Sequence, residues 1–299
     1  MTGIAPRGSI PIRNVSDTAL WVAMYRAMES ERADALFHDP YARRLAGERG
    51  AAIVSNMPSG QSMSWPLVVR TAVMDEIISR CVGAGVRTVL NLAAGLDTRP
   101  YRLDLPAELN WLHVDMPEMA DYFRAQMEQV TPRCRLTLIG ADLRDSDRRH
   151  EVFARAAALG EVLVVTEGLL IYLESAQVAD LARDLHDVAR AKWWLMDLAS
   201  PMLLKFLERQ WAPKLRESNA PFLFGPAENT AFFAPFGWRE AEFRSTWDES
   251  FRLHRTMRAA KLWRLLSRLQ SSKRREASKR MSGIALLQPT SGANQQGMT

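Results

Sequence analysis

Small and acidic residues follow short apolar stretches in the middle of the chain, and their spacing is the first chemical signal. One stretch ends in Ala93, Ala94 and Gly95, and the next ends in Asp115, 20 residues after the glycine. A turn of small residues lets a ligand approach the backbone closely. An acid about 20 residues further on accepts hydrogen bonds from both hydroxyl groups of a ribose. The pair therefore predicts a nucleoside site, against the alternative of a tight turn without a ligand.

The composition of this turn narrows the class of cofactor. Ala93 and Ala94 stand where a G-x-G-x-x-G fingerprint would have glycines. The turn is therefore poorly suited to a pyrophosphate, which argues against a nicotinamide or flavin enzyme. S-adenosylmethionine carries no phosphate. Its site therefore needs small residues that let it approach the backbone closely, more than it needs a cluster of backbone amide groups. We therefore expect S-adenosylmethionine as the cofactor, with Ala93 and Gly95 in its site.

Further residues at the ends of apolar stretches are candidates for the rest of this cofactor. The third stretch ends in Asp142 and Leu143, whose carboxylate and backbone N–H would bind the adenine. Glu167 ends the fourth stretch and would hold the ammonium group of the methionine part, while Arg70 would pair with its carboxylate. The ordinary alternative for Asp115 and Asp142 is a helix N-cap. For Glu167 and Arg70 the alternatives are a strand-end acid and a surface side chain.

The elements that must position these residues alternate along the chain, after a helical first part of about 85 residues. Short apolar stretches predict strands at 88–94, 111–116, 136–141, 162–167, 193–198, 238–246 and 284–288. Helical periodicity predicts helices at 117–129, 146–159 and 175–189. Alternating buried strands and helices indicate an α/β fold with a doubly wound, mostly parallel sheet. Such sheets bind ligands outside the carboxyl ends of their strands, where the winding reverses.

The order of elements also predicts the domain organisation. Residues 1–85 are expected to form an N-terminal helical cover, and residues 86–289 the cofactor-binding α/β domain, because no linker-like stretch interrupts the alternation. Within that domain, residues of about 200–236 are expected as an inserted lid over the acceptor. The aromatic residues of Phe222–Phe236 either line an apolar pocket there or pack in the core. Residues 290–299 are expected as a flexible tail.

The bulk composition is that of an ordinary globular chain with one unusual segment. Of 299 residues, 47% are hydrophobic and 24% are charged, and no apolar run approaches the roughly 20 residues that cross a bilayer. The first residues hold no signal-peptide core and the two cysteines have no metal-binding spacing, so we expect a cytoplasmic protein without a metal. Residues 252–280 hold eleven Lys and Arg against one acid. This balance indicates a solvated helix face or, alternatively, a non-catalytic binder of nucleic acid or anionic membrane.

Four runs of the sequence together resemble a known family: LAAGLDTRPYRL, HVDMPEM, GADLRD and EGLLIYL. They are similar to the leucine carboxyl methyltransferase family, in particular its bacterial branch of S-adenosylmethionine-dependent methyltransferases, over roughly residues 16–175. The resemblance implies a class I methyltransferase (Rossmann-like) fold, with a seven-stranded sheet and one antiparallel strand near its C-terminal edge. The family often has glycine at the position of Ala93. The resemblance also implies an enzyme with cofactor contacts at Arg70, Gly95, Asp115, Asp142, Leu143, Glu167 and, by a looser alignment, Arg26.

The implied reaction transfers a methyl group to an oxygen atom, and the acceptor decides whether a base is needed. None of the five histidines ends a predicted strand, and His113 lies within the second strand as a packed residue. A carboxylate is already ionised at neutral pH, whereas a phenol or an alcohol needs a base. We therefore expect a small-molecule carboxylic acid as the acceptor, oriented by Tyr172. The alternative is O-methylation of a phenol or hydroxyl group in a natural product; nucleic acid is not expected as a partner.

Overall fold

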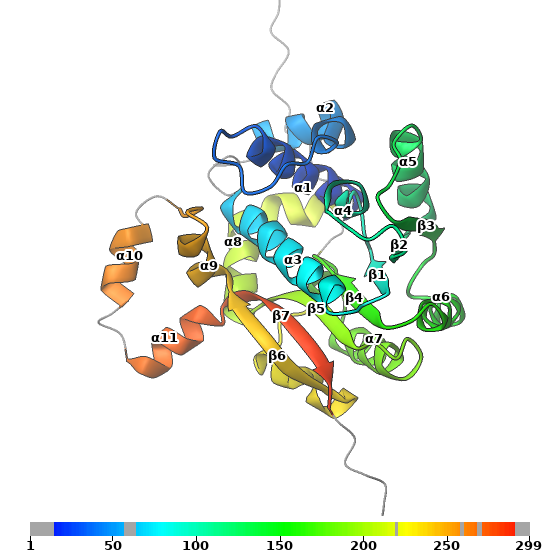
Figure 1. Cartoon of the computed structure of the whole chain (residues 1–299). Helices are drawn as coiled ribbons and strands as arrows, with labels where there is room; N and C mark the ends of the chain where they lie inside the picture. Colours follow the sequence, from blue (N-terminus) through cyan, green and yellow to red (C-terminus); the bar gives the residue numbers. More distant parts are fainter. Residues whose placement is uncertain (1–14, 57–63, 219–220, 258–259, 268–270, 291–299) are drawn as a thin grey trace, which may run out of the picture.

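A seven-stranded sheet forms the centre of the computed structural model, which describes residues 15–56, 64–218, 221–257, 260–267 and 271–290 (Figure 1). The strands are β1 Thr88–Leu92, β2 Asn110–Asp115, β3 Arg135–Gly140, β4 Val162–Thr166, β5 Trp193–Ala199, β6 Trp238–Ser245 and β7 Ser282–Pro289. Their order in the sheet is β3-β2-β1-β4-β5-β7-β6. Pairing from β3 to β5 is parallel, and β7 runs antiparallel to both β5 and β6. The predicted class I methyltransferase sheet is confirmed, including its antiparallel strand.

Helices cover both faces of this sheet, which is why its central strands read as continuous apolar stretches. The helices are α1 Val15–Ser30, α2 Ala42–Ser55, α3 Trp65–Gly83, α4 Arg99–Arg102, α5 Pro117–Met127, α6 Ser146–Ala158, α7 Ser175–Asp187, α8 Pro201–Ser218, α9 Thr246–Arg252, α10 Ala260–Ser267 and α11 Ser272–Lys279, with short 3-10 helices η2 Leu170–Tyr172 and η3 Asn229–Phe236. Val89 of β1 packs on the side of α3, and Leu90 packs on the side of α6 and α7. Neighbouring residues of one strand thus enter different cores. The predicted strands and helices end within one or two residues of the observed ones.

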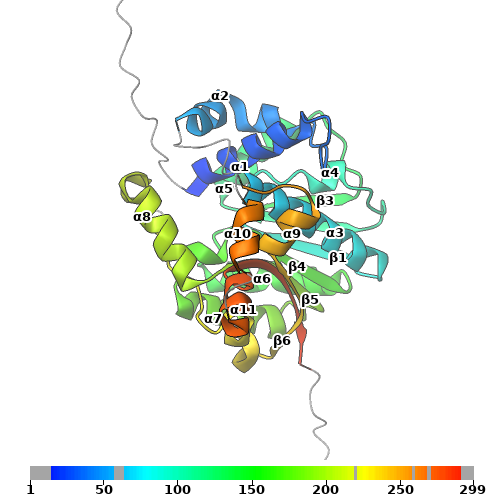
Figure 2. The same cartoon turned by 90° about the vertical axis from the view of Figure 1, so that its left-hand side faces the viewer.

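The N-terminal helices pack in two different places. α1 and α2 pack against each other and against α5 in a separate apolar cluster that includes Tyr25, Leu45 and Phe123, and both views place α1 and α2 together at the top (Figures 1 and 2). In contrast, α3 buries Val73 and Ile77 directly against the sheet. The expected boundary between a cover at 1–85 and a domain at 86–289 stays a prediction, and α3 packs as a helix of the sheet.

The C-terminal third supplies α8 and the smaller helices α9 to α11 (Figure 2). Of these small helices α9 contacts β6 and β7, and α11 contacts α9. Four basic residues of segment 252–280 form ion pairs with acids of other elements: Arg252 with Glu76, Arg255 with Glu29, Lys279 with Asp248, and Arg280 with Glu240. These pairs attach the segment to the body, which supports a structural role for its charge. No described helix is long and apolar enough to cross a membrane. The cytoplasmic location stays a prediction, and residues 291–299 of the expected tail lie outside the described part.

Candidate active site

A cavity of about 1280 Å³ lies over the carboxyl ends of β1, β2, β4 and β5. Strand order reverses its direction between β1 and β4, and sheets of this kind bind ligands at such a point. The structure brings together on the wall of this cavity every residue that the sequence placed in the site: Arg26, Arg70, Ala93, Gly95, Asp115, Asp142, Leu143, Glu167 and Tyr172.

The turn after β1 is held by the acid that ends β2. Gly95 has a φ of 54°, in the left-handed region, and its backbone N–H donates a hydrogen bond of 2.6 Å to Oδ2 of Asp115. The backbone N–H of Met116 donates one of 2.7 Å to Oδ1. Burial raises the pKa of Asp115, and the two hydrogen bonds oppose this change. Each carboxylate oxygen keeps a further lone pair, so Asp115 presents acceptors to a ligand at the turn.

The side chain of His113 contacts the same turn after β1. The side chain is fully buried within β2, as predicted for a packed histidine, and its ring stacks on Phe123 with 4.5 Å between the centroids. Nε2 lies 3.2 Å from the carbonyl oxygen of Gly95, so the ring donates its proton there. Burial lowers the pKa of His113 to about 4. The neutral ring therefore holds the turn and is unsuited to act as a base near neutral pH.

Asp142 and Leu143 lie at the margin of the cavity. The Asp142 carboxylate accepts hydrogen bonds from the backbone N–H and the guanidinium of Arg144, at 2.9 and 2.6 Å. These bonds lower the pKa of Asp142, and a third of its side chain is exposed. Leu143 packs against the core on the α6 side. Neither Asp115 nor Asp142 is an N-cap, because α5 and α6 take their caps from other residues; the ordinary alternative for both acids is therefore wrong.

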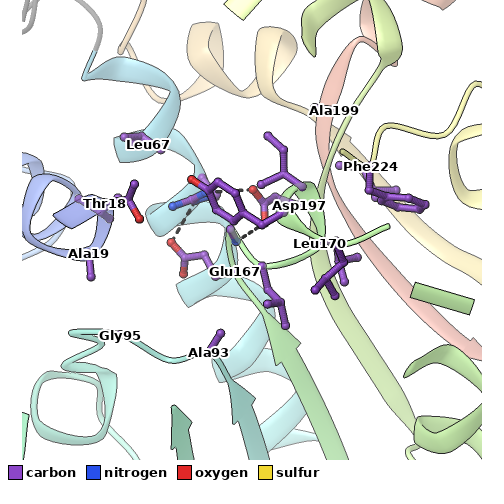
Figure 3. A pocket seen from close by; sticks show the side chains of 18 of the residues that line it. Thr18, Ala19, Leu67, Ala93, Gly95, Glu167, Leu170, Asp197, Ala199 and Phe224 are labelled. Atoms are coloured by element: carbon purple, nitrogen blue, oxygen red, sulfur yellow. Dashed lines mark hydrogen bonds and ion pairs between the residues drawn. The ribbon is translucent and has the colours of Figure 1, made fainter. Parts of the chain in front are cut away.

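Glu167, directly after β4, lies between two arginines. Nη1 of Arg99 donates to its Oε2 at 2.7 Å, and Nε of Arg70 lies 3.0 Å from its Oε1. Nη1 of Arg70 also donates to Oδ2 of Asp197 at 2.9 Å (Figure 3). Burial raises the pKa of Glu167, but Arg99 and Arg70 outweigh it and bring this pKa to about 2. Glu167 is therefore ionised near neutral pH and is a poor base.

Arg99 connects Glu167 to a buried network of charged side chains. Arg99, with 2% of its side chain exposed, donates to Asp75 at 2.6 Å and to Asp97 at 3.0 Å. Arg102 donates two further hydrogen bonds to Asp75. We name the whole set the charged cluster: Arg70, Asp75, Asp97, Arg99, Arg102, Glu167 and Asp197. Four carboxylates and three guanidinium groups give it a formal charge of −1, which favours a ligand with a net positive charge.

Arg26 and Tyr172 connect the N-terminal helices to the cavity. Arg26 of α1 donates to the carbonyl oxygen of Leu96 at 2.6 Å and to Asp39 at 2.9 Å. Tyr172 of η2 is hydrogen-bonded to Thr18 of α1, and burial raises the pKa of its phenol. Arg26 therefore holds α1 beside the turn that follows β1, and Tyr172 holds it beside η2.

Comparison with known proteins decides the family. The leucine carboxyl methyltransferase family matches residues 19–186, which is more than half of the chain. The chain belongs to this family. A relative in Mycobacterium bovis, named for S-adenosylmethionine-dependent methyl transfer, is 30% identical over 73% of this chain and 76% of its own. A relative in Frankia alni with the same kind of name is 31% identical, over 58% of this chain and 65% of its own length.

Solved structures agree on the fold. A DUF574 family protein from Streptomyces avermitilis covers 90% of this chain and 97% of its own, with a TM-score of 0.53 and 13% identity. A protein from Thermobifida fusca, described as a methyltransferase, covers 95% and 96% with a TM-score of 0.53 and 14% identity. At this level of identity the likeness shows a shared class I methyltransferase fold.

Five members of the charged cluster were not among the site residues expected from the sequence. Asp97, Arg99 and Asp197 line the cavity, and Asp75 and Arg102 lie behind them. Asp97 and Arg99 stand in the D-T-R run that carries the family resemblance, but Asp75 and Glu167, which also bind Arg99, are distant from it in sequence. Arg99 meets Glu167 across 68 residues, and Arg70 meets Asp197 across 127. The available signal for Asp197 was a lone acid in the otherwise apolar stretch Trp193–Ala199.

The other end of the cavity lies outside the family match, which stops in α7. It is lined by residues of β5, α8, β7 and the loops between them, and none of the described lining residues from Leu198 onward is charged. The expected lid segment contributes to this wall through α8 and through Phe222 and Phe224. Phe232 and Phe233, in contrast, pack in the core around Trp194. The aromatic segment thus serves both of the purposes expected for it.

Proposed function

We propose that the chain is an S-adenosylmethionine-dependent methyltransferase that methylates an oxygen atom of a small-molecule carboxylic acid. The observation that carries this proposal is the cavity at the reversal of strand order, where the Gly95 turn, Asp115 and the charged cluster line one space. Membership of the leucine carboxyl methyltransferase family supports the same cofactor and the same kind of acceptor.

The nucleoside part of the cofactor fits the turn end of the cavity. Asp115 would accept hydrogen bonds from the ribose hydroxyls, beside the small residues Ala93 and Gly95. Asp142 and the backbone N–H of Leu143 would bind the adenine at the cavity margin. The turn also packs closely against α1, because a Cβ atom at Gly95 would lie only 3.3 Å from the Cβ of Ala19.

The methionine part fits the charged cluster. S-adenosylmethionine carries a sulfonium, an ammonium and a carboxylate, so its net charge of about +1 complements the cluster's formal charge of −1. Glu167 would hold the ammonium and Arg70 the carboxylate, with Arg26 nearby on α1. Because Glu167 and Arg70 are paired with each other at 3.0 Å, the ligand would join an existing network. Asp197 offers an additional acceptor in that network.

The groups that line the cavity restrict the chemical class of the methyl acceptor. When bound, the cofactor supplies a methyl group that an acceptor oxygen takes while the S–CH3 electron pair stays on sulfur. None of the described residues that line the cavity is a histidine or a lysine, and the pKa of about 2 makes Glu167 a poor base. A carboxylate needs no base, because it is ionised at neutral pH. Tyr172 is the residue we assign to orienting the acceptor, since its ring lies 5.9 Å from Phe222 where the charged and apolar ends meet.

Calorimetry with S-adenosylmethionine and S-adenosylhomocysteine tests the cofactor assignment. We expect binding in the micromolar range, roughly −8 kcal/mol. Asp115→Asn removes the charged acceptor at the ribose and should weaken binding about 100-fold, since hydrogen bonds to a charged group contribute about 1.5–3 kcal/mol each. Asp121→Asn, an exposed acid on α5, is the matched control and should bind normally. Equal affinity of Asp115→Asn and the wild type would refute the ribose assignment.

A further inference from the structure

The cavity has a second, uncharged end, which we name the apolar arm. Its wall includes Leu203, Phe206, Phe222, Phe224, Trp247 and Ile284. Figure 3 shows Ala199 and Phe224 on the far side of Glu167 and Asp197 from Gly95. The apolar arm therefore continues the cofactor end of the cavity past the charged cluster.

The size of the cavity leaves room for a second ligand in this arm. Pockets for a single small ligand usually measure about 300–1,000 Å³, and the cavity measures about 1280 Å³. The nucleoside and methionine groups would occupy the end with Asp115 and Glu167. The apolar arm is the part that remains for the molecule that receives the methyl group.

The chemistry of the wall restricts that molecule. The polar side-chain groups of the described wall from Leu198 onward are the hydroxyls of Thr246, Ser278 and Ser282 and the indole N–H of Trp247. The hydroxyls of Thr246 and Ser282 lie 3.1 Å apart and bond to each other. A charged body in this arm would lose its hydration without gaining a partner of opposite charge from this wall, which is costly. An apolar body would gain free energy from burial.

The rim of the arm is also apolar. Met202 and Phe206 on α8 are 62% and 57% exposed, and Met257, which follows α9, is 40% exposed. All three line the cavity. Exposed apolar side chains gathered at the opening of a cavity are typical of a site that admits a hydrophobic ligand.

We infer that the methyl acceptor is a carboxylic acid with a long apolar body, which lies in the apolar arm while its carboxylate reaches the charged end. This inference rests on the proposed function and specifies its substrate class. In the reaction, the carboxylate oxygen forms a bond to the methyl carbon as the S–CH3 bond breaks, and the sulfur keeps the electron pair. The products are a methyl ester and S-adenosylhomocysteine, and no proton is transferred.

A series of straight-chain acids from butyrate to dodecanoate tests the inference. We expect kcat/KM for methyl ester formation to rise roughly fourfold for each added methylene until the arm is full, because about 0.8 kcal/mol accompanies each buried CH2. Alkaline release of methanol identifies the product as an ester. Calorimetry of dodecanoate with the protein saturated with S-adenosylhomocysteine gives a readout that does not depend on turnover.

Variants of α8 locate the acid in the arm. Leu203→Glu places a charge on the wall and should weaken dodecanoate binding at least tenfold, while S-adenosylhomocysteine binds normally. Leu203→Trp, which adds bulk without charge, should shift the preferred acid to a shorter chain. Leu223→Glu is the matched control, because Leu223 is exposed and does not line the cavity.

The readouts separate the two possible failures. If S-adenosylhomocysteine does not bind, the proposed function fails and the inference fails with it. If S-adenosylhomocysteine binds but neither kcat/KM nor acid affinity depends on chain length, or if both Leu203 variants behave as the wild type, the inference alone is overturned.

Discussion

The charged cluster at the cofactor end of the cavity is buried and paired, whereas the acceptor end includes exposed apolar side chains such as Met202 and Phe206. The first end is built from strand ends and α3, within the residues that match the family, apart from Asp197. The second is built from α8, β7 and their loops, beyond that match. The cofactor end thus lies mostly within the residues that match the family, and the acceptor end lies mostly beyond them.

The two ends also differ in what fixes their geometry. Arg99 holds three carboxylates, and this network is complete only when β1, β4 and α3 are all in place. The apolar arm depends on contacts of α8, which presents Met202 and Phe206 largely to solvent. A site that must align reacting atoms benefits from rigid support. A site that accepts an apolar body tolerates a less constrained wall.

The largest expected effect is the loss of Arg99. Arg99→Ala leaves Asp75, Asp97 and Glu167 short of a buried partner, and breaking a buried ion pair costs about 3–5 kcal/mol. Phe206→Ala on the acceptor end should change the free energy of unfolding by less than about 0.5 kcal/mol, as is usual for an exposed site. Urea unfolding measures both. Arg124→Ala removes an exposed pair with Asp121 and controls for the loss of an arginine. Equal costs for Arg99→Ala and Phe206→Ala would remove the contrast between the two ends.

A smaller effect is expected from protonation of His113. The folded protein holds the pKa of His113 at about 4, below the usual 6.5, so the unfolded chain binds the proton more readily. The stabilising contribution is complete above pH 6.5 and is lost as the pH falls from 6.5 toward 4, by an amount on the order of 3 kcal/mol. His113→Gln, which stays neutral, should flatten the dependence of the unfolding free energy on pH in this window. A slope that matches the wild type would show that His113 is not the titrating group.

Much of the cofactor end could be predicted from the sequence, because its residues follow directly from strand ends. The 20-residue spacing from Gly95 to Asp115 reflects two neighbouring parallel strands, and the observed hydrogen bond joins these two residues. The partners of Glu167 could not be read in the same way. Their pairing depends on which strands and helices become neighbours in space, and helical or strand periodicity does not encode it.

The acceptor end was less predictable for a different reason. The sequence left open whether the aromatic residues of Phe222–Phe236 line a pocket or pack in the core. In α8 likewise, apolar residues line a cavity that a ligand would fill, and periodicity alone cannot distinguish such a wall from a core. The sequence placed the lid segment near the acceptor, but the uncharged character of the wall became evident only when the lining residues came together.

The smallest predicted effect concerns Ala93, where the turn departs from the usual glycine. Ala93 has a φ of 49°, a left-handed conformation that costs a residue with a Cβ atom about 1–2 kcal/mol. Ala93→Gly removes this strain but adds conformational freedom to the unfolded chain, worth about 0.4–1 kcal/mol. The balance should raise the free energy of unfolding by roughly 0.5 kcal/mol, which replicate urea titrations can resolve. Ala19→Gly, in the second turn of α1, carries no such strain and should instead destabilise by about 0.5–1 kcal/mol. If both variants are destabilised alike, the backbone at Ala93 is not strained, and the cofactor end is no more constrained at this turn than an ordinary helix.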